Sequence, residues 1–279
     1  MKDALSWMDP RRRLPDGTDA FAIGTEEASG LTAFLNQFET LRSQNVIAVK
    51  GQWVGPLTFC LHARDPEGEP LISDPWKVER AFEVFARKVR WQVAKLKACA
   101  SQVIFFIDEP DLSESGILAS MESGEVSAML ARVAEVVREA GALAGLHACG
   151  TPSFKHLFGA GFDIVSFEVA RVPFEMESFE AELVHFYERG GLFAFGLVPT
   201  DRPFETPSLA EIQQTFDALL SRWAPLGLGG KRLTERCFIT PSCGLANHTP
   251  EGAAERVAFL KEVSVLLRQT YTSQVKFSL

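Results

Sequence analysis

Short apolar runs recur along this chain and alternate with longer stretches in which apolar and polar residues mix at helical spacing. Each run ends in polar or glycine-rich residues, as buried strands of a parallel sheet do. The pattern predicts six strands, at residues 46–50, 103–107, 143–147, 163–167, 192–197 and 237–240.

The intervening stretches predict helices at residues 75–98, 125–139, 179–189, 209–223 and 250–267. Asp74 precedes Pro75, and an acidic N-cap followed by proline is a typical helix start. Residues 32–42 also have a helical pattern. Repeated alternation of strand and helix favours a parallel sheet with helices outside it.

This alternation predicts an α/β fold of the TIM-type (β/α)8 barrel class, which has eight strands. Only the six runs are recognisable as strands, and residues 1–45 read as helix and loop, so we expect a barrel that is incomplete at its N-terminus. The length of 279 residues suits one such barrel. Because we find no internal repeat or long linker, we expect a single domain over residues 1–279, with 1–45 an irregular or helical segment.

Composition narrows the range of partners. The net charge of -8 argues against a nucleic-acid partner held by phosphate contacts. No apolar run approaches the roughly 18 to 20 residues that cross a bilayer, and the first residues lack the apolar segment of a secretory signal. Five scattered cysteines do not make a disulfide framework in a chain of this length. We therefore expect a cytoplasmic protein without membrane or nucleic-acid partners.

Strongly polar clusters lie at the carboxyl ends of the predicted strands, where parallel α/β folds place their sites. His147 and Cys149 are two residues apart on an extended segment, so their side chains point to the same face. An imidazole and a thiolate suit zinc, and Cys243 and Glu168, at neighbouring strand ends, can complete a tetrahedral site. The alternative is a hydrogen-bonded core histidine and two inert thiols.

Charged residues follow two other predicted strands. Asp108 and Glu109 precede a proline that ends the strand, so one carboxylate is expected to face the mouth of the barrel. The alternative is a pair of solvated acids near helix N-termini. Lys50 either binds an anion or pairs with one of these acids, and His248 lies in a loop near the predicted site. We expect the remaining cysteines and histidines in the core or on the surface. They are Cys60, Cys99, Cys237, His62, His156 and His185.

Five motifs, KGQWVGPLTF, IDEPDLSES, HACG, DIVSFEVAR and TPSCGL, occur in this order. Together they resemble the catalytic barrel of cobalamin-independent methionine synthases, from about residue 50 to the C-terminus. The resemblance implies that zinc is bound by His147, Cys149, Glu168 and Cys243. It also matches the homocysteine-binding acids of that family to Asp108 and Glu114, with Glu109, Lys50 and Trp53 as further substrate-binding candidates.

The activity that the resemblance implies is transfer of a methyl group to a thiol, with homocysteine as the expected acceptor, to give methionine. The chain departs from the family in three respects. It lacks the N-terminal barrel and the first strands of the catalytic barrel. It also lacks the histidine that the family uses as proton donor, and the residues FGLVPTDRP stand where that histidine is expected. When a methylated corrinoid gives up its methyl group, the cobalt(I) corrinoid that remains needs no proton. The leaving group of methyltetrahydrofolate is an amine, which must be protonated. We therefore expect a methylated corrinoid protein as donor and partner.

Other functions remain open at the level of sequence. A non-catalytic zinc-binding or corrinoid-binding barrel fits the missing first strands, and coenzyme M is a second possible thiol acceptor. A barrel of the uroporphyrinogen decarboxylase type would not use the His-x-Cys pair followed by Cys-Gly-Leu. Zinc hydrolases favour histidine and carboxylate ligands over two thiolates.

Overall fold

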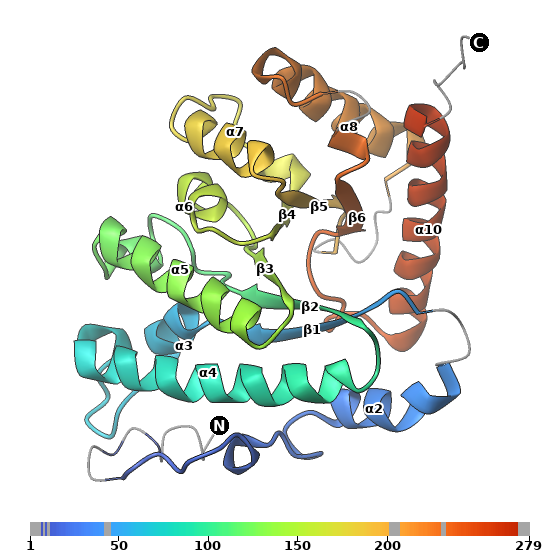
Figure 1. Cartoon of the computed structure of the whole chain (residues 1–279). Helices are drawn as coiled ribbons and strands as arrows, with labels where there is room; N and C mark the ends of the chain where they lie inside the picture. Colours follow the sequence, from blue (N-terminus) through green and yellow to red (C-terminus); the bar gives the residue numbers. More distant parts are fainter. Residues whose placement is uncertain are drawn as a thin grey trace. The chain divides into compact units, whose positions relative to one another are not determined.

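Six parallel strands alternate with helices in the computed structural model of the chain, which describes residues 7, 9, 12–41, 46–200, 207–229 and 233–272 (Figure 1). The strands follow one another in chain order. They are β1(Ala48–Val54), β2(Gln102–Asp108), β3(Leu143–His147), β4(Ile164–Glu168), β5(Leu192–Val198) and β6(Cys237–Pro241). The six predicted strands are thus confirmed, and the fold is α/β.

Eight α-helices are described. They are α2(Ser29–Leu41), α3(Pro56–His62), α4(Pro75–Lys97), α5(Ser123–Glu139), α6(Phe154–Gly159), α7(Glu180–Glu188), α8(Leu209–Trp223) and α10(Pro250–Thr272). The five long helices predicted from the sequence are confirmed, and the helix predicted at 32–42 is α2, whose predicted last residue lies outside the described part. The short helices α3 and α6 were not predicted from the sequence. None of the described helices is long and apolar enough to cross a membrane.

The described residues form six strands, fewer than the eight of a closed barrel. The chain divides into two compact units, Met1–His147 with Ala160–Phe162, and Ala148–Gly159 with Asp163–Leu279. We call them unit 1 and unit 2 and describe each by itself. The single domain expected over residues 1–279 stays a prediction.

Unit 1 is built on β1, β2 and β3, which pair in parallel. Alternate residues of β2, including Phe105 and Ile107, are fully buried, as expected where helices cover one face of a sheet. Helix α4 packs on β1 and β2, and α5 packs on β3. The helix α4 begins at Asp74, whose side chain accepts a hydrogen bond from the N–H of Trp76, as the sequence predicts for an N-cap.

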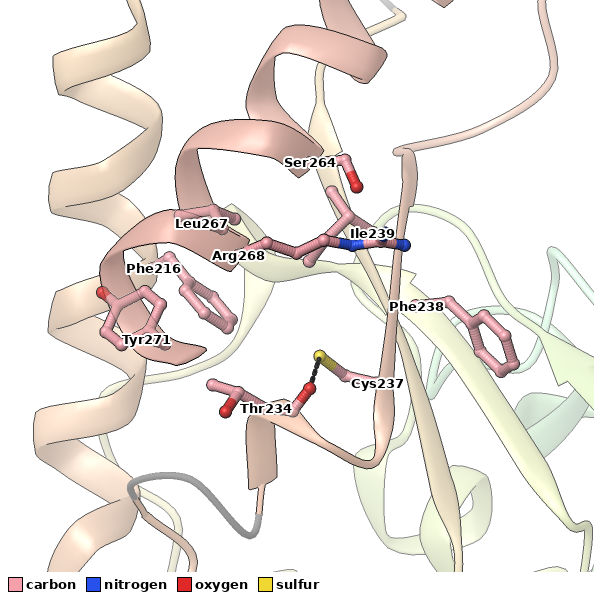
Figure 2. A pocket seen from close by; sticks show the side chains of 9 residues that line it. All are labelled: Phe216, Thr234, Cys237, Phe238, Ile239, Ser264, Leu267, Arg268 and Tyr271. Atoms are coloured by element: carbon pink, nitrogen blue, oxygen red, sulfur yellow. Dashed lines mark hydrogen bonds between the residues drawn. The ribbon is translucent and has the colours of Figure 1, made fainter. Parts of the chain in front are cut away.

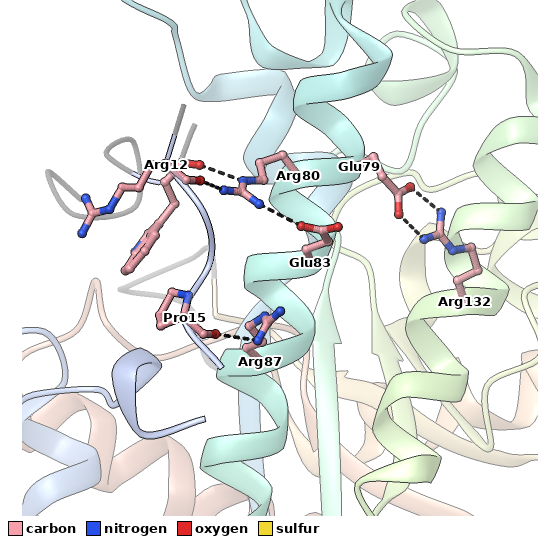
Figure 3. Close-up of polar contacts among 8 residues, drawn as sticks. Arg12, Pro15, Glu79, Arg80, Glu83, Arg87 and Arg132 are labelled. Carbon is pink, nitrogen blue, oxygen red and sulfur yellow. Dashed lines mark hydrogen bonds and ion pairs between the residues drawn. The ribbon is translucent and has the colours of Figure 1, made fainter. Parts of the chain in front are cut away.

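Arginines of α4 hold the N-terminal segment of unit 1 (Figure 3). Arg80 donates to the carbonyl oxygens of Trp7 and Arg12, and Arg87 donates to that of Pro15 at 2.9 Å. On the other side of α4, Arg132 of α5 makes two hydrogen bonds to the carboxylate of Glu79. The N-terminal segment predicted from the sequence is therefore held against α4 at Trp7, Arg12 and Pro15.

Unit 2 contains β4, β5 and β6, also parallel, with β5 in the centre. The residues of β5 after Leu192 are buried throughout, and aromatic side chains fill the space between this strand and α8. Phe167 and Phe195 meet edge to face at 5.8 Å between ring centroids, and Trp223 of α8 packs against both rings. Such pairs stabilise the core beyond their buried area. Helix α10 packs on β6 and α8.

Candidate active site

In unit 1, polar side chains from within β1 meet the last residue of β2, so Lys50 lies inside its strand and not at the strand end that the sequence predicted. Lys50 and Gln52 lie on the same face of β1, since successive side chains of a strand alternate. The Nε2 of Gln52 donates to Oδ2 of Asp108 at 3.1 Å, and Nζ of Lys50 donates to Oε1 of Gln52 at 2.5 Å. The structure thus brings together two sequence candidates, Lys50 and Asp108, through Gln52. Sequence reasoning did not select Gln52, for which the one signal was its spacing of two from Lys50.

Burial sets the charges of this group. It raises the pKa of Asp108 to about 6, although the positive charge of Lys50 acts in the opposite direction. It also lowers the pKa of Lys50, which the charge of Asp108 partly offsets. A carboxylate that is desolvated in this way gains most from a further cationic partner, such as the ammonium group of an amino acid.

Glu109 has a different environment from its neighbour Asp108. Its side chain is fully buried, and its two oxygens accept hydrogen bonds from the backbone N–H groups of Leu57 at 3.1 Å and Thr58 at 2.7 Å. A Cβ on Gly55 would lie 1.9 Å from Oε1 of Glu109, so the turn requires glycine there. Burial raises the pKa of Glu109 to about 7, although the hydrogen bonds from Thr58 and Leu57 act in the opposite direction.

This placement makes Glu109 a clamp that ties the start of α3 to the end of β2. The sequence offered it as a substrate-binding residue, but neither oxygen reaches the surface in this structure. The cause is tertiary, because the partners at 57 and 58 are about fifty residues earlier in the chain. Gly55, Leu57 and Thr58 lie in the motif KGQWVGPLTF, and no feature of the sequence indicated this contact.

Two further candidates of unit 1 lie in different settings, and within the described residues neither makes a side-chain hydrogen bond or ion pair with Lys50 or Asp108. Trp53 has the opposite orientation in β1, and Nζ of Lys88 from α4 lies 5.5 Å from the centroid of its ring. Trp53 therefore belongs to the face that α4 covers. Glu114 is exposed in the loop between β2 and the 3-10 helix η4(Ile117–Ala119). The substrate-binding roles of Trp53 and Glu114 stay predictions.

In unit 2, two thiols meet at the carboxyl ends of the strands. The Sγ of Cys149, in the loop after β3, lies 2.9 Å from the Sγ of Cys243, which follows β6. His147 is the last residue of unit 1 and precedes Cys149 by two residues, so the chain itself holds it nearby. The ligand atoms of His147, Cys149 and Cys243 all lie within 4.8 Å of one another.

These three side chains fit a zinc ion. Tetrahedral zinc with bonds of about 2.0 to 2.3 Å has ligand atoms less than about 4 Å apart, so small side-chain rotations would suffice. One imidazole and two thiolates are also the donors that favour zinc over harder cations. The group can therefore hold a metal ion.

Glu168, the fourth predicted ligand, does not belong to this group of three. It is the last residue of β4, and its Oε2 accepts a hydrogen bond from Nε of Arg171 at 3.2 Å. The role of Glu168 as a ligand stays a prediction.

A buried hydrogen-bond network supports the segment that carries Cys243. The hydroxyl of Ser242 accepts from the N–H of Thr200 at 3.1 Å, and the N–H of Ser242 donates to the carbonyl oxygen of Val198 at 2.8 Å. His248 Nε2 lies 3.0 Å from the carbonyl oxygen of Thr200. The hydroxyls of Thr200 and Ser242 also lie 3.1 Å apart. The sequence singled out His248 but missed Thr200 and Ser242, for which it contained no signal beyond the motif.

Close packing at the strand ends also depends on Gly196 of β5. A Cβ on Gly196 would lie 2.8 Å from the Cα of Ser242 and 2.9 Å from the carbonyl oxygen of Phe167. Only glycine lets the ends of β4, β5 and β6 approach this closely. A small pocket of about 100 Å³ lies beside them, with Glu168, Gly196 and Ser242 among its lining residues.

The remaining thiols and histidines mostly have the structural places expected of them. Burial raises the pKa of Cys60 to about 12 and that of Cys237 to about 11, so both thiols are protonated at neutral pH. His156 is buried, with Nδ1 2.8 Å from the hydroxyl of Ser153. None of these three is among the grouped ligands within the described residues.

The comparisons with known proteins concern most of the chain. A family model described as "Cobalamin-independent synthase, Catalytic domain" matches residues 24–265. No curated protein matches the chain.

Two similar solved structures are a prolidase complexed with N-methylphosphonate-L-proline and an uncharacterized protein. The first has 16% identity and a TM-score of 0.39, over 84% of this chain and 58% of that one. The second has 14% identity and a TM-score of 0.38, over 82% and 56%. The chain thus spans less than three fifths of either protein's length. At these scores neither likeness bears on its function.

Proposed function

This chain belongs to the cobalamin-independent synthase catalytic-domain family, whose activity is of the methyltransferase type, and on that premise we propose that it is a zinc-dependent methyltransferase acting on a thiol. We propose homocysteine as the acceptor and a methylated corrinoid protein as the donor. The observation that supports this most is the group formed by His147, Cys149 and Cys243, whose ligand atoms lie within 4.8 Å of one another.

These three residues would hold the zinc ion, with Glu168 as the fourth ligand. When bound there, zinc supplies the positive charge that lowers the pKa of a thiol substrate, so that its sulfur reacts as a thiolate near neutral pH. The network of Thr200 and Ser242 keeps the segment of Cys243 in place, since both side chains are buried and hydrogen-bonded to each other.

The acceptor loses its thiol proton to solvent, and a lone pair of its sulfur forms the new bond to the methyl carbon. The electron pair of the broken bond between donor and methyl group stays with the donor. Asp108 is the residue that we assign to the ammonium group of homocysteine. Its carboxylate already accepts a hydrogen bond from Gln52 and is only partly solvated, so a cation beside it is favourable.

The choice of a corrinoid donor follows from the proton balance. A methylated corrinoid leaves as cobalt(I) and takes no proton, whereas methyltetrahydrofolate leaves as an amine that needs general acid catalysis, typically worth about 10² to 10⁴ in rate. A candidate for the general acid is His248, which follows the predicted zinc ligand Cys243 by five residues. Its Nε2 is 3.0 Å from the carbonyl oxygen of Thr200, which can only accept a hydrogen bond. The hydrogen on Nε2 is therefore engaged within the protein.

The test combines metal analysis with an assay. Purified protein should contain one zinc per chain and methylate homocysteine from methylcobalamin or a methylated corrinoid protein, but not detectably from methyltetrahydrofolate. Cys243→Ser should lose both zinc and activity, and Cys237→Ser, a thiol of the same strand region outside the group, should keep both.

Each result has a distinct meaning. Full zinc content in Cys243→Ser would overturn the metal assignment. Robust turnover with methyltetrahydrofolate would overturn the donor. Stoichiometric zinc without any methyl transfer would instead identify a metal-binding barrel without catalytic activity.

A further inference from the structure

Three side chains of unit 1, Lys50, Gln52 and Asp108, form a row along one face of the sheet, and the middle one has no role in the reaction proposed above. Nζ of Lys50 donates to Oε1 of Gln52 at 2.5 Å, and Nε2 of Gln52 donates to Oδ2 of Asp108 at 3.1 Å. Lys50 and Gln52 belong to β1, and Asp108 ends the neighbouring strand β2. The amide of Gln52 therefore separates an ammonium group from a carboxylate.

The chemistry of its two neighbours fixes the orientation of the Gln52 amide. An ammonium group only donates hydrogen bonds, and an ionised carboxylate only accepts them. If the amide were turned over, its NH2 group would face Lys50 and its oxygen would face Asp108, so both contacts would be repulsive. An apolar side chain at this position would satisfy neither neighbour.

A second contact holds Lys50 on its own side of the row. Its Nζ lies 5.0 Å from the centroid of the Phe106 ring, within the range of a cation–π interaction. The Phe106 ring lies over Gly145 of β3, where a Cβ would be 2.7 Å from Cδ1 of that ring. Within the described residues, Lys50 makes no ion pair with Asp108, and its ammonium group is held by Gln52 and Phe106.

The Asp108 carboxylate has an oxygen available for a further cation. In the part of the chain that the structure describes, the bond from Gln52 is the one hydrogen bond that this side chain accepts, and it uses Oδ2. Oδ1 is therefore left for a ligand. The side chain is half-buried, and a partly desolvated carboxylate gains from an opposite charge beside it.

We propose that Gln52 is a positioning residue that makes the site selective for thiols carrying an ammonium group. By donating to Oδ2 it fixes the direction of the Asp108 carboxylate, and by accepting from Lys50 it keeps that cation from occupying the carboxylate. Oδ1 of Asp108 then receives the ammonium group of the acceptor. This role rests on the proposed function, and it makes the preference for homocysteine over a thiol without an amino group depend on residue 52.

Steady-state kinetics of methyl transfer from methylcobalamin to homocysteine, on the zinc-loaded full chain, test this role. The competing thiol is 4-mercaptobutanoate, which is homocysteine without its amino group. Gln52→Met keeps the length of the side chain but removes both hydrogen bonds. It should raise KM for homocysteine by about 3- to 10-fold, as loss of one net hydrogen bond does, and leave kcat unchanged. The inhibition constant of 4-mercaptobutanoate should not change, because this thiol has no group for Asp108 to bind.

A double-mutant cycle tests whether Gln52 acts by separating Lys50 from Asp108. Without Lys50 there is no cation to occupy the carboxylate. The rise in KM that Gln52→Met causes should therefore be smaller in a Lys50→Met background than in the wild type.

Two control variants lie outside the row. Gln102→Met makes the same substitution at the exposed first residue of β2. Ser264→Ala changes a residue of a pocket at the amino end of β6, whereas Cys243 follows the carboxyl end of that strand (Figure 2). Both controls should keep the wild-type KM and inhibition constant. Gln52 is itself exposed, so Gln52→Met should keep the zinc content and thermal stability of the wild type.

An unchanged KM for homocysteine in Gln52→Met would overturn the role of Gln52 and leave the proposed function intact. An equal rise in this KM and in the inhibition constant of 4-mercaptobutanoate would also overturn it, because a merely structural residue does not distinguish the two thiols. The same holds for a rise in KM that is equal in both backgrounds of the cycle. A wild type that transfers no methyl group to homocysteine would instead overturn the proposed function, and the role of Gln52 with it.

Discussion

Replacing Glu109 with glutamine tests whether this carboxylate is a structural clamp. Its oxygens accept hydrogen bonds from the N–H groups of Leu57 and Thr58, and the side chain is fully buried. Glutamine keeps one acceptor oxygen but places an NH2 group against the second N–H. A buried N–H without a partner costs about 1 to 3 kcal/mol, so we expect Glu109→Gln to be less stable than the wild type by about this amount at pH 5.

The same variant has a diagnostic pH dependence. Burial raises the pKa of Glu109 to about 7, against about 4.3 in an unfolded chain. Between these values the folded state binds the proton more tightly, so the stability due to this group is greatest at low pH and is lost as the pH rises through 7. A difference of this size corresponds to about 4 kcal/mol in the free energy of unfolding. Glutamine does not titrate, so the deficit of the variant should shrink or reverse by pH 8.

Urea unfolding followed by tryptophan fluorescence between pH 5 and 8 measures this difference. The control is Glu79→Gln. A hydrogen bond from Arg132 lowers the pKa of Glu79, so that residue stays ionised throughout this range and its difference from the wild type should be constant. Parallel stability curves for the wild type and Glu109→Gln would refute the reasoning.

Three further changes test the candidate site. Gly196→Ala adds a Cβ 2.8 Å from the Cα of Ser242, so we expect about 1 to 3 kcal/mol of lost stability and less than one zinc per chain, by thermal unfolding and metal analysis; full zinc content would contradict this. In zinc-free protein, diamide should oxidise Cys149 and Cys243, whose sulfurs lie 2.9 Å apart, to a disulfide by taking one hydrogen from each. A thiol titration should then fall by two, whereas an equal loss in zinc-loaded protein would argue against shared ligation. Asp108→Asn should lower kcat/KM for homocysteine by about 10- to 100-fold, as loss of a hydrogen bond to a charged group does, with zinc unchanged; an unimpaired variant would remove Asp108 from substrate binding.

The sequence was sufficient to place the strands and most helices. Strand β3 and helix α8 begin and end where the apolar pattern predicts, and each other predicted element differs by one to five residues at one end or both. Buried parallel strands give uninterrupted apolar runs, and surface helices repeat their apolar face every three to four residues. Helices α3 and α6 were missed because six or seven residues are too few for that repeat.

The sequence also determined the parts of the site that depend on local spacing. His147 and Cys149 are two residues apart, and a strand end fixes their relation without reference to the rest of the chain. Cys243 was recognisable as a second thiol from its place at the end of another predicted strand, and the resemblance of its motif supported that choice. Lys50 and Asp108 were recognisable as polar residues that end apolar strands.

Only the tertiary structure decided which of these side chains reach solvent or each other. Adjacent acids looked equivalent in the sequence, yet Asp108 lies beside Lys50 and Gln52 while Glu109 is buried against the N–H groups that begin α3. Trp53 lies on the helix-covered face, and Gly196 is required by backbone atoms at 167 and 242. These outcomes depend on contacts between residues about thirty to sixty positions apart, and the pattern of neighbouring residues contains no information about them.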